Sequence, residues 1–300
     1  MHTGILFGLS AALSWGVADF LAQFSSRQIG AFRTLFYMQV AGVLCASAYI
    51  AAIGVSPAAV WQGIAQHPGL ALFMGGASGA AMLSFYSALE RGRISIVAPI
   101  SSSYPALTVL LAYASGERLT APRMAGVLCT ICGVVLAAIA EAPKQGAPAA
   151  EHARHAAMGA GVLLALACAL TFGVVYWALG FYAIPAWGGI GTVWIQRFST
   201  LVWMAVLARP LRWGLRVPSG GALGLVSLVG LLDATGFLLS NLGFQREQVG
   251  VVTVLGSLFG AVAVLLAMVV LAERLSKRQW LGVALIFAGI VLINSPAAWR

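Results

Sequence analysis

The sequence predicts an all-α polytopic membrane protein with ten transmembrane helices, arranged as two inverted repeats of five. Three observations carry this prediction: the composition, the spacing of long apolar runs, and a similarity between the two halves of the chain. Of the 300 residues, 61% are hydrophobic and 8% are charged, whereas soluble globular proteins carry about 25% charged residues. A mean hydropathy of +0.94 means that the chain cannot cover a water-soluble surface, so its solvent is expected to be largely lipid.

The apolar runs define the predicted helices, because a spanning helix needs about 20 mostly apolar residues. Short breakers of polar, glycine or proline residues separate the runs, which predicts hairpins of neighbouring helices. Within the fourth run, Tyr104 and Pro105 are expected to kink the helix. The ten predicted spans cover residues 4–25, 33–54, 68–90, 93–114, 122–141, 157–180, 187–208, 221–243, 248–271 and 278–295.

The charge balance fits loops beside a membrane. The chain has 17 Lys and Arg against 8 Asp and Glu, a formal net charge of +9. These basic residues stand in small groups between apolar runs, as in the loops of membrane proteins, so no nucleic-acid partner is expected. Cys129 and Cys132 form a CxxC inside an apolar run, where packing is the expected role. His152 and His155 lack further ligands nearby, so no metal or other cofactor is expected.

The two halves of the chain repeat each other. Residues 142–156 are polar, contain proline and carry both charges, which predicts a linker between a first repeat, 1–141, and a second, 157–300. Shifts of 156 and 157 residues align the halves almost without gaps. The aligned pairs include Gly16 with Gly173, Gln39 with Gln196, Glu117 with Glu273, Gly126 with Gly282 and Gly133 with Gly289.

Five helices per repeat is an odd number, so the second repeat is predicted to begin on the opposite side of the membrane. Inverted repeats place a substrate site near the midplane between them, and rocking of one repeat against the other gives alternating access. The sequence therefore predicts a secondary transporter. A Walker motif is absent, so a gradient of substrate or protons would drive transport.

Several motifs resemble EamA-type members of the drug/metabolite transporter superfamily. They are Trp15-Gly16, the "GERL" at 116–119, the "AERL" at 272–275 and the apolar segment 279–293. The resemblance covers essentially the whole chain. It implies a multi-pass exporter of amino acids or related metabolites in the bacterial inner membrane. Because the superfamily also includes carriers of sugars and nucleotide sugars and pumps for cationic drugs, the substrate stays open.

Ionisable residues within a membrane span are costly and usually mark a substrate or ion path. Arg197 and Asp233 lie near the middle of consecutive antiparallel spans, so an ion pair is plausible. The pair could be purely structural, or Arg197 could anchor a substrate carboxylate that Asp233 holds or competes with. For Asp19 three alternatives stand: it binds a substrate ammonium, it couples transport to protons, or it lies solvated near the interface.

Uncharged polar and aromatic residues in the spans complete the predicted substrate site. For each aromatic residue taken alone, contact with lipid is the simpler alternative. Glu117 and Glu273 are expected at helix ends, with the adjacent Arg118 and Arg274 as their partners. The further predicted site residues are Trp15, Tyr37, Gln39, Trp177, Trp194, Gln196 and Asn241.

Two questions remain open in the sequence. The family resemblance implies that both termini lie in the cytoplasm, whereas the Lys and Arg count of the loops favours both termini outside. An intramembrane enzyme is the weaker alternative function, because HExxH and GxSxG motifs are absent. The expected partners are a small-molecule substrate, protons as a second candidate, and the lipid bilayer, with the chain a monomer or a weak homo-oligomer.

Overall fold

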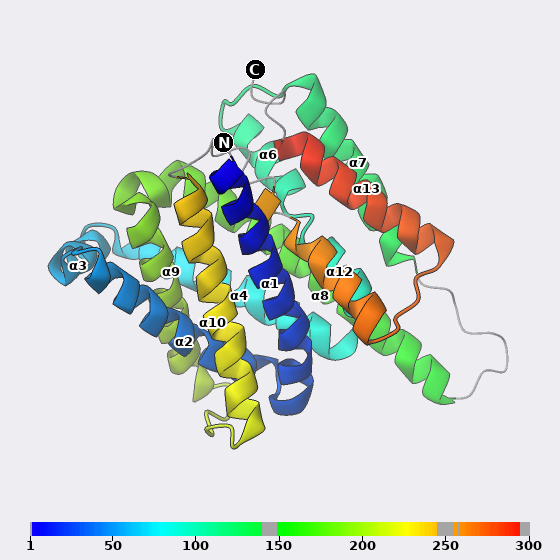
Figure 1. Ribbon diagram of the computed structural model, residues 1–300, viewed down its shortest axis with the longest axis horizontal. Coiled ribbons are helices and arrows are strands. Elements are labelled where there is room, and N and C mark those ends of the chain that lie inside the picture. Colours follow the sequence, from blue (N-terminus) through cyan, green and yellow to red (C-terminus); the bar gives the residue numbers. More distant parts are fainter. Residues whose placement is uncertain (1, 140–148, 245–254, 257, 295–300) are drawn as a thin grey trace.

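The computed structural model describes residues 2–139, 149–244, 255–256 and 258–294, and every regular element in these ranges is a helix (Figure 1). The first repeat contains α1 (His2–Ile29), α2 (Ala31–Ala52), α3 (Pro57–Gln66), α4 (Pro68–Arg91), α5 (Ile94–Ser101), α6 (Pro105–Ala114) and α7 (Ala121–Ala138). The second contains α8 (Ala149–Ala178), the π-helical turn η1 (Leu179–Ala183), α9 (Ile184–Ala208), α10 (Gly221–Phe244), α12 (Phe259–Val270) and α13 (Lys277–Asn294).

Within the described residues, seven helical stretches are long and apolar enough to cross a membrane. One of them, Glu151–Ala208, has 58 residues. At 1.5 Å per residue a straight helix of that length would measure about 87 Å, far more than the roughly 30 Å hydrocarbon core. This stretch instead contains the π-helical turn η1, close to Pro185, and kinks at Gly188, whose φ of 68° is not helical. The chain is therefore a multi-pass membrane protein.

The fourth predicted span is broken, as the sequence indicated. α5 ends at Ser101, and Pro105 begins α6 as its first residue. Proline lacks a backbone N–H and clashes with the preceding turn, so the helix cannot continue through this point. In the break, the hydroxyls of Ser102 and Ser103 donate hydrogen bonds of 2.6 Å to the carbonyl oxygens of Ala98 and Ile100.

Some predicted boundaries were wrong. The breaker around residues 54–63 contains α3, which starts at Pro57 and is too short to span a bilayer. α8 begins at Ala149 rather than at residue 157, because the alanine-rich stretch after residue 148 favours helix. Of the predicted span 248–271, α12 covers the last part, and residues 248–254 and 257 lie outside the described ranges.

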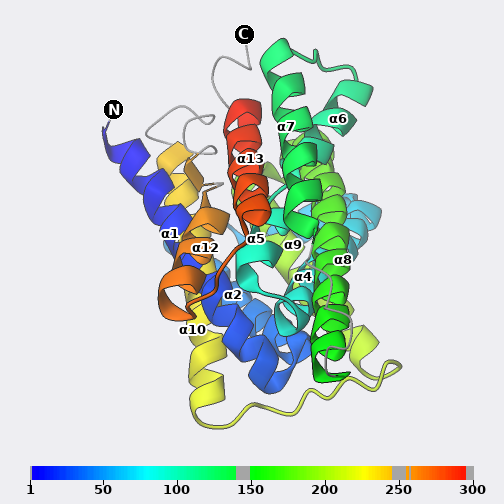
Figure 2. The same cartoon turned by 90° about the vertical axis from the view of Figure 1, so that its right-hand side faces the viewer.

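The helices of the two repeats pair in a symmetric way. α1 packs along α10, and their counterparts in the other repeat, α8 and α4, pack along each other; α2 also crosses α9, its own counterpart. Figures 1 and 2 show α1 and α8 running in opposite directions through the bundle. The start of α1 and the end of α13 lie at the same end, so the chain crosses the bundle an even number of times.

The contact between α7 and α13 shows the same symmetry at the level of single residues. Gly126 faces the backbone of Gly289, and Gly133 faces the backbone of Gly282. The repeat shift converts the first contact into the second. A Cβ at any of the four glycines would lie within 3 Å of neighbouring backbone atoms, so the two antiparallel helices can approach this closely only with glycine there.

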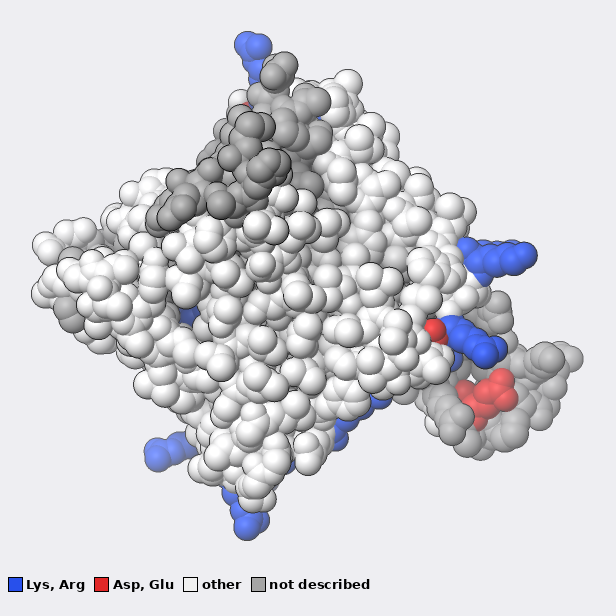
Figure 3. All heavy atoms as spheres, in the orientation of Figure 1, with Lys and Arg blue, Asp and Glu red and all other residues white. Residues whose placement is uncertain are grey.

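Hydrogen bonds tie several loops together at the end of the bundle where α1 finishes. Arg27 donates to the carbonyl oxygens of Leu89 (3.2 Å) and Gly92 (2.8 Å), and Arg93 donates to that of Arg274 (3.4 Å). Because most described Lys and Arg residues belong to these helix ends and loops, we call this the basic end. Figure 3 shows basic side chains along the lower and right margins and a face almost free of charge between them.

Replacing Gly133 with alanine is predicted to destabilise the protein by about 1–3 kcal/mol, because the new methyl group overlaps the backbone of α13. Gly224→Ala in α10 is the matched control, since nothing lies within 4 Å of its Cβ position. There, alanine is expected to leave the melting temperature unchanged or slightly higher. Thermal unfolding of the purified protein in detergent measures both, and equal melting temperatures would contradict the close α7–α13 contact.

Candidate substrate site

Arg197 lies in the middle of α9 and points into the crossing of α2, α9 and α10. It is only 6% exposed. Gly42 of α2 makes room for it, since a Cβ there would overlap the guanidinium. Gln39, one turn earlier on α2, accepts a hydrogen bond of 3.2 Å from Nη1 through its Oε1. On α2, the glycine therefore leaves space for the arginine side chain and the glutamine accepts a hydrogen bond from it.

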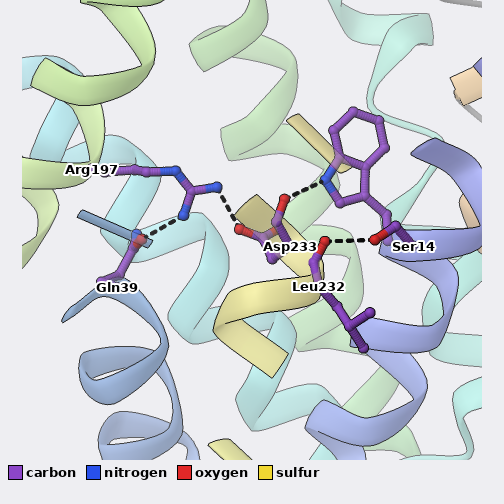
Figure 4. Close-up of polar contacts among 6 residues, drawn as sticks. Ser14, Gln39, Arg197, Leu232 and Asp233 are labelled. Carbon is purple, nitrogen blue, oxygen red and sulfur yellow. Dashed lines mark hydrogen bonds and ion pairs between the residues drawn. The ribbon is translucent and has the colours of Figure 1, made fainter. Parts of the chain in front are cut away.

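Asp233 of α10 also contacts the guanidinium and forms an ion pair with Nη2 of Arg197 (Figure 4). The predicted ion pair is thus present. The guanidinium also lies over the ring of Phe237, 4.7 Å from its centroid. Arginine has five N–H donors. Two of them point at Gln39 and Asp233, and the other three have no hydrogen-bond partner among the residues the structure describes.

The α1 helix fixes the backbone that carries Asp233. The Ser14 hydroxyl donates to the carbonyl oxygen of Leu232 (2.7 Å), and the Trp15 indole N–H donates to that of Asp233 (3.2 Å) (Figure 4). Trp15 also packs edge-on against Phe237, with centroids 5.1 Å apart. Both carbonyl groups lie within the continuous helix α10. The two bonds therefore position α10 against α1 without interrupting the backbone hydrogen bonds of α10.

Asp19 lies one turn beyond Trp15, half-buried, and close enough to Asp233 for the two charges to interact. It forms no ion pair with a described residue. One turn further on, Gln23 is fully buried, and both polar atoms of its amide lack a partner among the described residues. Tyr86 of α4 is also buried and lies within electrostatic range of Asp19, Asp233 and Arg197. The site therefore extends from Arg197 across to α1 and α4.

Sequence reasoning missed Tyr86 and Phe237. The spacing of four residues does place Gln23 on the helix face of Asp19, but Gln23 was not among the predicted site residues. Tyr86 and Phe237 carried no such signal, because aromatic residues are common throughout the spans and a sequence does not tell which of them face the interior.

Four predicted site residues direct their polar groups to partners other than Arg197 or Asp233. Their roles in substrate binding stay predictions, and Asn241 lies in α10 with a side chain outside the described part of the structure. The four contacts are Tyr37 to the Leu215 carbonyl oxygen (2.9 Å), Trp177 to the Ser115 hydroxyl (2.9 Å), Trp194 to the Ser47 hydroxyl (2.8 Å) and Gln196 to the Ser78 hydroxyl (2.6 Å).

The glutamates of the two "ERL" motifs have other partners than expected. Glu117 pairs with Arg123 at 3.4 Å rather than with Arg118. Glu273 accepts hydrogen bonds from the backbone N–H and the hydroxyl of Ser95, in the first turn of α5. A carboxylate there satisfies a backbone donor and complements the helix dipole. Glu273 therefore links the loop of the second repeat to a broken helix of the first.

The relationship of this chain to known proteins follows from its match to one protein family. The EamA-like transporter family matches residues 2–139 and 159–295. The chain belongs to this family. The two matched ranges cover both repeats, so the two-repeat architecture of EamA-like transporters accounts for the paired helices described above.

Two further similarities agree with this assignment. "Uncharacterized protein MJ1333.1" from Methanocaldococcus jannaschii is 31% identical over 140 residues, which are 46% of this chain and 98% of that protein. That relative is therefore about as long as one repeat. A solved structure described as "Crystal structure of protein" matches with a TM-score of 0.66 over 99% of both chains, at 22% identity. This likeness shows a shared fold and nothing about substrate.

Removing one partner of the central pair is predicted to destabilise the protein far more than removing both. Arg197→Met and Asp233→Leu each leave an uncompensated buried charge, which costs about 3–5 kcal/mol, whereas the double variant recovers most of that loss. Arg91→Met is the control, because it breaks an exposed pair with Glu90 (3.6 Å) that contributes about 0–1 kcal/mol. Unfolding by SDS titration measures all four, and additive single effects would contradict the pairing.

Proposed function

We propose that this protein is a secondary transporter that exports small carboxylate-bearing metabolites, with amino acids as the first class to test. It would have ten spans in two inverted repeats and act by alternating access across a bacterial inner membrane. The observation that carries the proposal is the buried Arg197 at the crossing of α2, α9 and α10, where three of its N–H donors have no hydrogen-bond partner within the described part of the chain. A guanidinium binds a carboxylate with two parallel hydrogen bonds.

The position of the site supports alternating access. α2 and α9 are repeat counterparts and cross each other near Arg197, so the arginine lies close to the symmetry axis that relates the repeats. A rocking motion of one repeat against the other changes the access to such a point from one side to the other. The substrate and Asp233 would then share the arginine during the cycle.

Counterflow in proteoliposomes tests this function. Amino acids and other carboxylates are expected to exchange, and the double variant Arg197→Met/Asp233→Leu is expected to lose at least about 90% of that exchange, because it lacks the carboxylate anchor. Any exchange of amines that lack a carboxylate should be spared. The control is Arg91→Met, which keeps the site intact. Full exchange of carboxylates by a folded double variant would disprove the role of Arg197.

The distribution of charge supports an orientation with the basic end in the cytoplasm. Helix ends and loops there carry most of the described Lys and Arg, and cytoplasmic loops of membrane proteins are enriched in these residues. Both termini would then lie outside, against the expectation from the family resemblance. The residues at this end are Arg27, Arg33, Arg91, Arg93, Arg209, Arg212, Arg216, Arg274, Lys277 and Arg278.

Reporter fusions to the C-terminus test the orientation. Alkaline phosphatase is active only outside the cytoplasm, so a C-terminal fusion is predicted to be active, and a fusion within the 209–220 loop is predicted to be inactive. The reverse pattern would place both termini in the cytoplasm.

A further inference from the structure

A pocket of about 180 Å³ extends from the guanidinium of Arg197 between α2, α9 and α10. We call it the α2–α9–α10 pocket. Apart from Arg197, its described lining is uncharged and mostly apolar. The lining residues are Gly42, Cys45, Ala46, Tyr49, Ile50, Ile190, Val193, Leu231, Ala234, Thr235, Phe237 and Leu238.

The pocket leads away from the basic end. On α2 its lining follows Gly42 up to Ile50, and on α9 it runs from Arg197 back to Ile190. On α2 this direction leads toward α3, and on α9 it leads toward η1, away from the helix ends that belong to the basic end (Figure 1). Leu231, one of its lining residues, is 52% exposed. Figure 3 shows basic atoms recessed in the uncharged face where α2, α9 and α10 meet.

The chemistry of the walls selects the ligand. Among the described lining residues the one cationic group is Arg197, which has N–H donors without a partner among those residues and therefore suits a carboxylate. The apolar walls suit an apolar body, and a cavity of about 150 Å³ is known to hold benzene. No Asp or Glu is among the described lining residues, and the carboxylate of Asp233 is already paired with Arg197, so an ammonium group seated among the apolar walls would be buried without a free charged partner, which is unfavourable.

We propose that the α2–α9–α10 pocket binds monocarboxylates whose apolar part is about the size of a benzene ring, with the carboxylate on Arg197 and without the need for an ammonium group. The inference rests on the proposed role of Arg197 as a carboxylate anchor. It narrows the substrate class from carboxylate-bearing metabolites in general to apolar monocarboxylates.

Three matched compounds test the ligand class on the purified wild-type protein by isothermal titration. 3-Phenylpropionate, phenylalanine and phenethylamine share the phenylalkyl body and differ in which charged groups they carry. 3-Phenylpropionate is expected to bind at least as tightly as phenylalanine, and phenethylamine is expected to bind at least about tenfold more weakly, since it lacks the carboxylate. Tighter binding of phenylalanine by tenfold or more, or no binding of 3-phenylpropionate, would overturn the proposal.

Two alanines of α2 test the location. Ala46 lines the pocket, whereas Ala48, two residues away, is exposed and does not. Ala46→Phe is expected to raise the Kd for 3-phenylpropionate at least about tenfold by filling the pocket, and Ala48→Phe is expected to leave it unchanged. Ala234→Leu fills the same pocket from α10 and serves if Ala46→Phe does not fold. An unchanged Kd in a folded pocket variant would overturn the proposal.

The two proposals fail in different ways. If the pocket variants bind 3-phenylpropionate normally while counterflow of carboxylates still depends on Arg197, the pocket assignment is wrong and the transport function stands. If wild-type protein binds 3-phenylpropionate at the pocket but exchanges no carboxylate, the function is wrong and the pocket stands.

Discussion

The buried guanidinium of Arg197 is the interaction on which the centre of this bundle depends. A charge at this depth is tolerated only with partners, because its transfer from water to an apolar interior costs several kcal/mol. Each neighbouring helix supplies one: α2 the amide of Gln39 and the space at Gly42, and α10 the carboxylate of Asp233 and the ring of Phe237. α1 in turn holds α10 through Trp15. Three helices thus contribute, directly or through a neighbour, to the surroundings of one side chain on α9.

A symmetric scaffold carries this asymmetric centre. The glycine contact between α7 and α13 occurs in two copies that the repeat shift relates. The packing of a helix of one repeat along a helix of the other also occurs twice, as α1 along α10 and as α4 along α8. The charges appear once. By the repeat alignment Arg197 corresponds to Val40, Asp233 to Ala77, and Asp19 to Tyr176, which stacks on Tyr104 at 4.4 Å. The duplicated glycines therefore serve packing, whereas the single charged positions distinguish one repeat from the other.

The sequence predicted the helical membrane class, the repeats, the break at Pro105 and the Arg197–Asp233 pair, because these depend on composition, periodicity and the cost of buried charge. It did not predict α3, which is too short for a hydropathy signal, or the hydrogen bonds from Glu273 to Ser95, which join residues 178 positions apart. Tyr37 and Trp177 look like site residues in sequence, yet their polar groups bond elsewhere. Whether such a side chain faces the site depends on its direction around the helix axis, and tertiary packing sets that direction.

The central claim is that Asp233 and a ligand carboxylate share the charge of Arg197. The most direct measurement is the Kd of 3-phenylpropionate for the folded Asp233→Asn variant beside the wild type. Removing the competing negative charge should favour a second carboxylate at the same guanidinium, so several-fold tighter binding is predicted. An unchanged or weaker affinity would mean that Arg197 serves only its ion pair.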